Sequence, residues 1–554
     1  MHSYLGKLRE LFADGRCDRR EFLRTATLLG VSAGTAYAMA GAADPVPSFA
    51  RAAWAAPKPG SRLRIAMRIL EIKDPHTVSW VEASNVIRPV CEYLTRTDQD
   101  NVTRPYLLES WQPSEDLKTW TLNLRRDVKW HDGRPFVADD VVWNIKRCLD
   151  PATGSSVLGL MKAYMITEVP TGEMKDGKEV KRSELWDANA IEKIDDHTVR
   201  LNLKVPQLAV PEHLFHYPFF MLDPADGGKF GVGTNGTGPF VLKEHVIGEK
   251  AVYEAYPNYW RDGAKVEQAV YIDTGDEMAT AIAALASGQV DGLYELDVSQ
   301  IATVRQLPDM VISEAVTAQT GVARGHCGIK PFDDPRVRKA LRLAIDPPAA
   351  KEALLADLGR VGEHHHVAPI HPEYAKLPPM NRDLAEAKRL LAEAGYPDGL
   401  DLEIACKSAP AWEPNAVQVL VEQWKDANIR VKINIMPSSA YWDNWTKFPF
   451  GFTSWGHRPL GTMVLALAYR TGVPWNESHY SNPEFDRLLL QAEATYDVEK
   501  RRAIMEKLEE IMQEDGPIVQ PFWRPVQTAH HKRMTGFQEH PTQYIFLEQL
   551  GLSE

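Results

Sequence analysis

The run "LRRDVKWHDGRPFVADDVVWNIKRCLDP", residues 124–151, sets the fold of this chain. Its first half alternates apolar and polar residues as hairpin strands do, and Asp132 and Gly133 supply a tight turn. The run "VADDVVWNIKRCLD" follows as a short helix, which Pro151 ends. We therefore expect a hairpin that leads directly into a helix. In isolation the pair His131 and Asp132 in this turn resembles catalytic residues.

The segments on either side of this run differ in their patterns. Up to about residue 277, strand-like pieces predominate, and the glycine-rich run "NGTGPF" is typical of a turn between two of them. Beyond that point, helices with apolar residues at i, i+3, i+4 and i+7 alternate with strands, and the C-terminal end returns to strands. The chain has 554 residues, well above the roughly 250 to 300 at which a single core stops growing. The order of elements predicts two lobes between which the chain crosses twice.

Composition narrows the class of protein. Hydrophobic residues make up 44% and charged residues 25% of the chain, as in ordinary soluble globular proteins. The 63 Lys and Arg residues against 75 Asp and Glu residues give a net charge of −12. This acidic balance argues against a nucleic-acid partner, which would require a basic surface. Beyond the N-terminal segment no run approaches 18 consecutive apolar residues, so we expect no membrane span in the mature chain.

The N-terminal segment carries the pattern of an export signal. In "CDRREFLRTATLLGVSAGTAYAMAGAA" the adjacent Arg19 and Arg20 precede an uncharged run, residues 25–43, that contains A-x-A cleavage sites. The R-R-x-F-L core resembles a twin-arginine signal. We predict a twin-arginine-type signal peptide over residues 1–43, cleaved after passage through the twin-arginine translocase. Residues 44–60 are predicted to be a Pro/Ala-rich linker.

Cysteine usage fits export without a lipid anchor. No cysteine follows the uncharged run directly, so the exported protein is predicted to be soluble in the periplasm. Four cysteines lie beyond the signal, none in a C-x-x-C pair: Cys91, Cys148, Cys327 and Cys406. Four cysteines allow three pairings, and the sequence does not distinguish among them. Buried free thiols are predicted for at least two of the four.

Six runs of this chain together resemble the extracytoplasmic solute-binding proteins of family 5, the peptide, nickel and opine binders of ABC importers. The opening run is similar to the signature region of that family, with its strand, W-H-D-G turn and helix start. The other five follow in family order: residues 235–260, 284–293, 330–346, 387–399 and 480–497. One departure is Val137, where the family often has Thr or Ser as the helix N-cap. We expect Asp139 or Asp140 to cap that helix instead.

The resemblance implies an α/β fold, namely a two-lobed periplasmic-binding-protein clamp of type II. It is the large form, with an extra β-rich subdomain and a hinge between the lobes. The first lobe would comprise residues 60–318 and 520–554, and the second residues 319–519. Solute would bind in the cleft, and hinge closure would bury it. Ligand stabilises the closed form only to the extent that it contacts both lobes.

The same resemblance implies the periplasmic substrate-binding component of an ABC importer. Its partners would be a small polar solute and an inner-membrane ABC permease with its ATPase. We expect a monomer without a cofactor. A periplasmic enzyme is the remote alternative, because no G-x-S-x-G, H-E-x-x-H or glycine-rich phosphate loop appears.

The run "GFTSWGHRPLG", residues 451–461, bears on the identity of the solute. It provides the candidate ligand-binding residues Trp455, Gly456, His457 and Arg458. Peptide binders of the family carry W-x-x-D here, and that Asp pairs with the α-ammonium group of the peptide. In this chain Arg458 stands where the Asp would be. A buried encounter between two cations is unfavourable, so binding through a peptide amino terminus is predicted to be lost.

A second run, "PAWEP", supplies Trp412 as a further candidate. It matches the aromatic residue of dipeptide binders, whereas their carboxylate-clamping Arg is replaced by Pro410. We hypothesise that the solute presents an anionic or oxygen-rich end to Arg458, with Trp412 and Trp455 stacked on its body. Opines, acidic sugars joined to amines, or modified amino acids would fit. Alternatively, Arg458 pairs with a carboxylate of its own lobe, and neutral hydrogen bonds select the ligand.

Nickel or metal-chelate binding, known in the same family, is the alternative function. The run "GEHHHVAPIHPEY", residues 362–374, contains three consecutive histidines. In an extended loop His364 and His366 lie on one side and could share a metal ion, whereas His365 points away. A polar loop near the cleft mouth explains the same residues without a metal.

Overall fold

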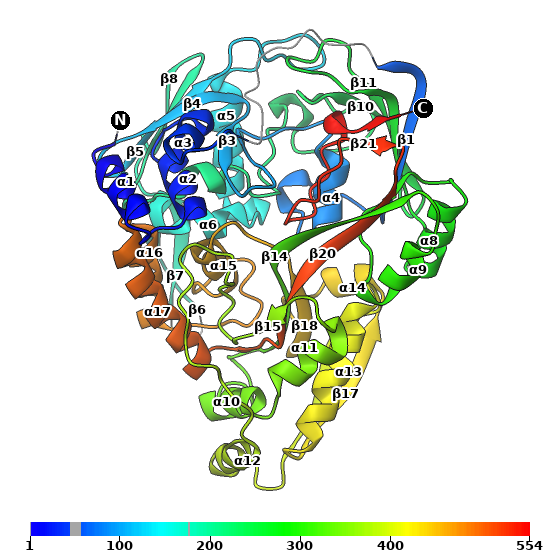
Figure 1. Cartoon of the computed structure of the whole chain (residues 1–554). Helices are drawn as coiled ribbons and strands as arrows, with labels where there is room; N and C mark the ends of the chain where they lie inside the picture. The colour runs from blue at the N-terminus through cyan, green and yellow to red at the C-terminus, as the bar shows by residue number, and fades with distance from the viewer. Residues whose placement is uncertain (1, 45–56, 176–177, 554) are drawn as a thin grey trace.

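The computed structural model describes residues 2–44, 57–175 and 178–553, and one mixed sheet runs through both of its halves (Figure 1). The main path of this 12-stranded sheet is β10-β11-β12-β1-β13-β20-β14-β18-β16-β17, with β15 and β19 paired beside it. The long strands β14 (Met310–Gly325) and β20 (Phe522–His531) pair antiparallel at its centre. They carry the chain between the half that contains β1, which we call lobe I, and the half that contains β16, which we call lobe II.

The remaining strands of the sheet divide between the two lobes. Lobe I contributes β1 (Lys58–Ala66), β10 (Phe240–Val246), β11 (Lys250–Ala255), β12 (Val266–Ile272) and β13 (Gly292–Leu293). Lobe II contributes β15 (Arg360–Val361), β16 (Leu400–Lys407), β17 (Ile429–Met436), β18 (Phe450–Trp455) and β19 (Ile518–Val519). Strand β1 is parallel to β12 and β13, and β16 is parallel to β17 and β18. The α/β class is as predicted, and the predicted lobe boundaries fall inside β14 and between β19 and β20.

Helices cover the sheet in both lobes. Lobe I carries α4 (Val81–Ile87), α5 (Ala138–Leu149), α6 (Val157–Met165), α7 (Val210–His213), α8 (Met278–Ala286) and α9 (Ile301–Arg305). Lobe II carries α10 (Pro335–Leu343), α11 (Pro347–Leu355), α12 (Leu384–Glu393), α13 (Trp412–Lys425), α14 (Ser438–Trp442), α15 (Gly461–Ala468), α16 (Pro483–Glu493) and α17 (Val498–Glu514). In lobe II, Leu341, Leu390 and Trp424 belong to one buried core beneath α10, α12 and α13.

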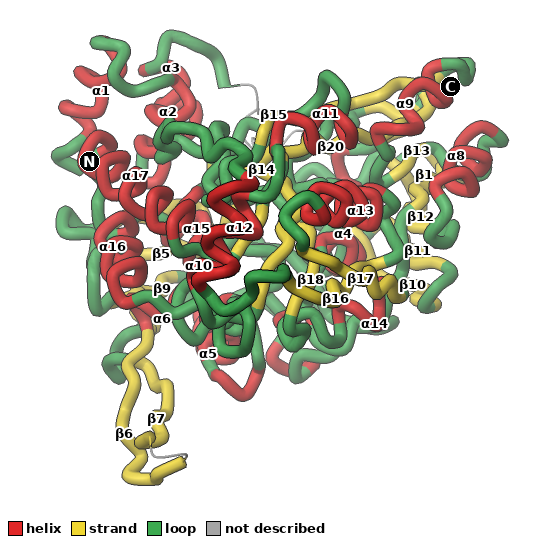
Figure 2. The backbone as a smooth tube through the Cα atoms, turned by 90° about the horizontal axis from the view of Figure 1, so that it is seen from below, coloured by secondary structure: helices red, strands yellow, loops and turns green. Residues whose placement is uncertain are grey.

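A β-rich subdomain forms the outer part of lobe I. Its four-stranded antiparallel sheet has the order β4 (Leu108–Pro113), β5 (Thr119–Leu124), β9 (Thr198–Asn202), β8 (Ile191–Asp195). A separate hairpin of β6 (Ile166–Lys175) and β7 (Lys178–Leu185) projects away from the rest of the molecule (Figure 2). This subdomain matches the extra β-rich unit that the sequence predicts.

The opening run forms the predicted turn and helix. After β5, the predicted second hairpin strand is reduced to a single bridge between Lys129 and Pro135. Helix α5 then begins at Ala138, and the Asp140 carboxylate accepts a hydrogen bond from the Val137 backbone N–H at 2.9 Å. Val137 thus remains the N-cap residue, and the expected shift of the cap to Asp139 or Asp140 is wrong; Asp140, at the third helical position, supplies only the bond of a capping box that runs back to the N-cap N–H.

The histidine of this turn has a structural role. The His131 backbone N–H donates to the Gly236 carbonyl at 2.8 Å, and its ring Nε2 lies 2.8 Å from the Gly238 carbonyl oxygen. Burial lowers the pKa of His131, so the ring is neutral at pH 7. These bonds tie the W-H-D-G turn to the run "NGTGPF".

Replacement of Gly236 by alanine is expected to destabilise the protein by about 3 kcal/mol. A Cβ atom at this position would lie 1.9 Å from the Val90 carbonyl oxygen, and this backbone cannot move aside. Urea denaturation measures the loss. The matched control is Gly231→Ala, because a Cβ there meets no atom within 4 Å. Equal stabilities of the two variants would contradict the packing of the "NGTGPF" turn against Val90.

The N-terminal segment, residues 2–44, is folded against both lobes. It forms α1 (Leu5–Ala13), α2 (Arg19–Leu28) and α3 (Ala33–Met39), whose apolar faces are buried. Cleavage after the predicted signal peptide therefore stays a prediction. Most of the predicted linker lies outside the described residues, and β1 begins before the linker's predicted end.

All five cysteines are free, and only Cys327 is not fully buried.

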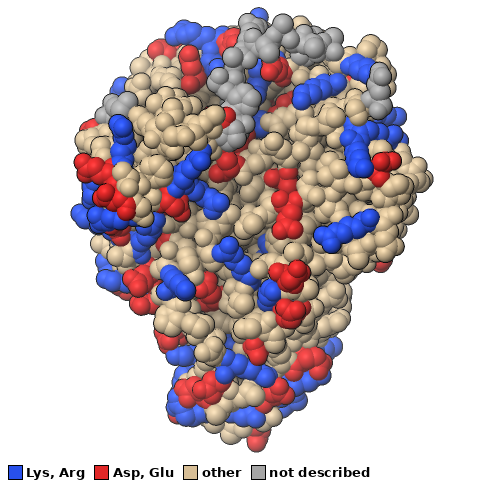
Figure 3. All heavy atoms as spheres, in the orientation of Figure 1, with Lys and Arg blue, Asp and Glu red and all other residues tan. Residues whose placement is uncertain are grey.

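Among the described residues, no helix is both long and apolar enough to cross a membrane. On the face seen in Figure 3, acidic and basic side chains are interspersed without a continuous basic stripe.

Candidate functional site

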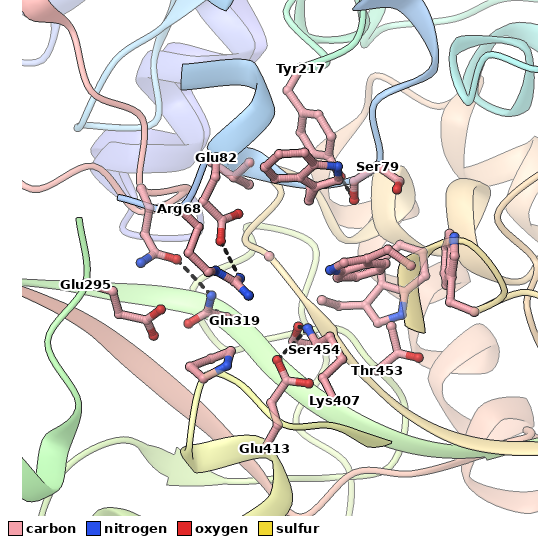
Figure 4. A pocket seen from close by; sticks show the side chains of 18 of the residues that line it. Arg68, Ser79, Glu82, Tyr217, Glu295, Gln319, Lys407, Glu413, Thr453 and Ser454 are labelled. Carbon is pink, nitrogen blue, oxygen red and sulfur yellow. Dashed lines mark hydrogen bonds and ion pairs between the residues drawn. The ribbon is translucent and has the colours of Figure 1, made fainter. Parts of the chain in front are cut away.

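A cavity lies between the two lobes, and its empty space, including the part open to solvent, is about 670 Å³. Both lobes line it, and its labelled residues converge from α4, β14, β16, α13 and β18 and from loops, among them the loop that follows β1 (Figure 4). Aromatic side chains form much of its wall: Trp80, Tyr217, Tyr294, Trp412, Trp442, Trp445, Trp455 and Trp475. Such a wall suits a ligand with a flat or apolar body.

Four of the five predicted ligand-binding residues line this cavity, namely Trp412, Trp455, Gly456 and Arg458. Trp455 is the last residue of β18, and Trp412 is the first residue of α13. The two tryptophans are 3% and 8% exposed, so their rings are fixed by packing before any ligand arrives. The structure thus brings together residues that lie more than forty positions apart in the sequence.

His457 does not line the cavity, unlike the other four candidates, and a role for it in ligand binding stays a prediction. Its Nδ1 accepts a hydrogen bond from the Ala318 backbone N–H at 3.0 Å, and its Nε2 lies 3.0 Å from Asn101 Oδ1. Both nitrogens of its ring are thus held by partners outside the cavity. His457 joins the loop of Arg458 to the central strand β14 and to lobe I.

Trp455 is positioned by a buried carboxylate below it. Its indole Nε1 donates to Glu477 Oε1 at 2.9 Å, and Arg324 Nε donates to Glu477 Oε2 at 2.7 Å. Thr453 also donates to Oε2 of Glu477. With every oxygen of this carboxylate bonded, the end of β18 is rigid, and the loop that follows is held at the cavity wall.

Arg458 is buried without a carboxylate partner among the described residues. It is 4% exposed, and its guanidinium donates to the backbone oxygens of Gly456 at 3.2 Å and His457 at 3.0 Å. Its charge also faces the rings of Tyr217 and Trp475, at 4.9 and 5.9 Å from the ring centres. The sequence left open a pairing with a carboxylate of the same lobe; among the described residues the hydrogen bonds of the Arg458 guanidinium go to backbone oxygens only.

The other three cations of the cavity each have a carboxylate at 2.7 Å. The pairs are Arg68 with Glu82, Lys407 with Glu413, and Arg524 with Glu295. The lining therefore has one more cation than carboxylates, and Arg458 is the cation left over. Water and salt screen charges only weakly in a buried site. The excess positive charge therefore favours a ligand that places a negative group near Arg458.

Burial shapes the charges of these pairs. Burial raises the pKa of the Glu413 carboxyl, while Lys407 opposes that rise. Burial lowers the pKa of Arg68, but Glu82 outweighs this effect and the pKa is raised overall. Removal of either partner would leave the other charge buried and uncompensated, so each pair depends on both of its members.

The sequence did not indicate these paired residues. Arg68 follows β1, Glu82 lies in α4, and Lys407 ends β16. They belong to no local motif and come into contact only when the chain folds, so a single sequence gives no signal for them. A weak signal existed for Glu413 alone, since it neighbours Trp412 in "PAWEP".

The candidate metal-binding histidines do not face each other across a shared site. His364 Nδ1 accepts a hydrogen bond from the Gln520 backbone N–H at 2.9 Å, whereas His366 Nδ1 lies 2.6 Å from the Tyr469 hydroxyl. Both rings are buried. Among the described residues, no group of three or more His, Cys, Asp or Glu side chains is placed to hold a metal ion.

The chain matches known proteins along most of its length. The family model of bacterial extracellular solute-binding proteins, family 5 middle region, matches residues 103–507. The periplasmic oligopeptide-binding protein OppA of Haemophilus influenzae is 27% identical over 475 residues, which are 81% of this chain and 85% of that protein.

Two solved structures share the fold. The Helicobacter pylori periplasmic binding protein DppA, in complex with the peptide STSA, superposes with a TM-score of 0.77 at 21% identity. The superposition covers 89% of this chain and 98% of the DppA chain. The binding protein AgaA of A. tumefaciens R10, in complex with agropinic acid, gives a TM-score of 0.78 at 21% identity. This superposition covers 89% of this chain and 99% of the AgaA chain.

Proposed function

This chain belongs to the bacterial extracellular solute-binding proteins of family 5, and we propose that its cleft holds a solute by an anionic or oxygen-rich end at Arg458. Proteins of this family bind small solutes for ABC importers and work with an inner-membrane permease. Two-lobed clamps of this kind capture solute by closing around it. The chemistry of the cleft therefore determines which solute is carried.

One observation carries the proposal: Arg458 is the cavity cation that lacks a carboxylate among the described residues. A guanidinium binds a carboxylate or similar group with two parallel hydrogen bonds. An α-ammonium group placed here would meet a cation in a poorly screened site. The three carboxylates of the cavity are already paired, so they offer less to a cationic ligand.

The aromatic wall narrows the solute class further. Trp412 and Trp455 approach the cavity from lobe II and Tyr217 approaches it from lobe I. A ligand with an acidic end and a ring or a flat body would contact both lobes, which is what closure requires. Opine-like compounds combine these features, and AgaA, which shares this fold, was solved with agropinic acid.

The cellular setting is proposed from the same family membership. We place the mature protein in the periplasm as a soluble monomer without a lipid anchor and without enzymatic activity. Export through the twin-arginine translocase rests on Arg19 and Arg20 and on the uncharged run that follows them. OppA, a periplasmic protein, matches 81% of the chain and supports this location.

A thermal-shift panel tests the solute class. We expect opines and other acidic conjugates to raise the melting temperature, since a ligand at 1,000 times its Kd adds about 4 kcal/mol of stability. Ordinary dipeptides, neutral sugars and Ni²⁺ should leave it unchanged. Stabilisation by Ni²⁺ that a chelator removes, with no response to acidic compounds, would favour the metal alternative and contradict the proposal.

A further inference from the structure

The N-terminal segment occupies a groove to which both lobes contribute. Towards lobe I, Arg24 Nε donates to Glu212 Oε1 at 2.6 Å, and the Tyr37 hydroxyl donates to Asp100 Oδ2 at 2.6 Å. Arg24 and Glu212 are 2% and 1% exposed, so this ion pair is fully buried. Residues 2–44 are thus packed into lobe I by charge as well as by apolar contact.

The same segment binds lobe II at the start of α17. Arg501 donates to the carboxylate of Glu21, and this pair is also buried. The Tyr4 hydroxyl accepts a hydrogen bond from the Val498 backbone N–H at 3.1 Å. Two views agree that α1 and α2 lie beside α17 (Figures 1 and 2).

Glu21 and Arg24 lie one turn apart on α2, yet they pair with opposite lobes. If the lobes separate while the segment is attached, at least one of the two pairs must break. Breaking a buried pair leaves an uncompensated charge in the interior, which is strongly unfavourable. The helix therefore opposes opening through two side chains whose spacing it fixes.

The burial of α2 is consistent with this arrangement. Arg19 and Arg20 are exposed at its first turn, whereas residues 21–29 are buried. Docking therefore buries Glu21, Arg24 and the start of the uncharged run while leaving the adjacent arginines at the surface.

We propose that residues 2–44 act as a strap that docks across both lobes and holds the clamp closed for as long as the segment stays attached. The proposal rests on the clamp mechanism of the proposed function. Loss of the segment at the predicted cleavage sites would remove both buried pairs at once and free the lobes to open. The groove and its occupant thus form an intramolecular interface specific to the precursor.

Hydrogen exchange on the full-length chain, without any solute, tests the strap. The variants Glu212→Gln and Arg501→Gln change the body and leave the export segment intact. Each should raise amide exchange in residues 21–39 at least tenfold and expand the molecule in small-angle X-ray scattering. The matched control is Arg430→Gln, which removes an exposed ion pair with Asp401 on the outer edge of lobe II.

A second measurement covers the case in which these variants fold poorly. A protease site placed between residues 50 and 51 allows the segment to be cut after the full chain has folded. The cut segment should remain bound, and its displacement by salt should expand the molecule. Rapid exchange of residues 21–39 in the unaltered chain, or release without expansion, would overturn the strap. Neither result would bear on solute binding by the cleft.

Discussion

Replacement of Arg458 by alanine is expected to weaken binding of the solute by about 100-fold or more. Removing one partner of a buried, hydrogen-bonded charge pair costs roughly 2–5 kcal/mol, and 2.7 kcal/mol corresponds to a factor of about 100. Arg458→Lys should retain part of the affinity, because lysine keeps the charge but loses the bidentate geometry. Isothermal titration with an acidic solute found in the thermal-shift panel measures both effects.

The control for this experiment is Arg430→Ala, which removes a surface guanidinium from the same lobe. Its affinity should equal that of the unaltered protein. The melting temperature of ligand-free Arg458→Ala should stay close to that of the unaltered protein, since no carboxylate is left unpaired by the change. If Arg458→Ala binds the solute as tightly as the unaltered protein, Arg458 does not hold the ligand.

Replacement of Lys407 by methionine is expected to destabilise the ligand-free protein by about 3–5 kcal/mol. Lys407 and Glu413 have 2% and 0% of their side chains exposed, so the variant leaves a carboxylate without a counter-charge in the interior. The double variant Lys407→Met with Glu413→Leu should recover most of this loss, because both charges are then gone. Urea denaturation at pH 7 measures all three proteins.

The matched control uses an exposed pair on neighbouring strands of lobe II. Lys432 and Glu403 are 79% and 48% exposed, and Lys432→Met should change stability by no more than about 0.5 kcal/mol. A Lys407→Met protein as stable as this control would show that the cleft pair is not buried in solution. A double variant as unstable as the single one would show that packing, not charge, explains the loss.

The sequence predicted the fold through local signals that the structure preserves. The W-H-D-G turn and helix α5 lie where the opening run places them. Only the strand "VKW" was overestimated, because its residues bond across the turn to Arg134 and Phe136 and form a single bridge there rather than a ladder with β5. The residues that form a turn are neighbours in the sequence, so a turn can be predicted from it. The partner of a short strand depends on distant segments and cannot be predicted in this way.

The site was only half predictable. Trp455 and Arg458 could be named because they lie in one run, but the run gave no signal that the His457 ring would bond to Ala318 and Asn101 outside the cavity. The pairs of Arg68 with Glu82 and Lys407 with Glu413 join segments far apart in the chain. A pattern in a single sequence does not show which distant residues come into contact in the fold.

The N-terminal segment shows a different limit of sequence patterns. Its charged start and uncharged run predict an export signal, and they say nothing of where those residues lie before export. The complementary charges Glu212 and Arg501 are distant in sequence, so the docking of α2 between them becomes visible only in the folded chain.

Native mass spectrometry of protein purified from the periplasm of its host tests the solute assignment most directly, because a closed clamp can retain its ligand through purification. We expect an added mass that fragments to a compound with a carboxylate or a similar anionic group, and we expect that mass to be absent from Arg458→Ala protein. A retained ligand that carries only positive charge, or one held equally by the Arg458→Ala protein, would contradict the assignment of the cleft to an anionic solute.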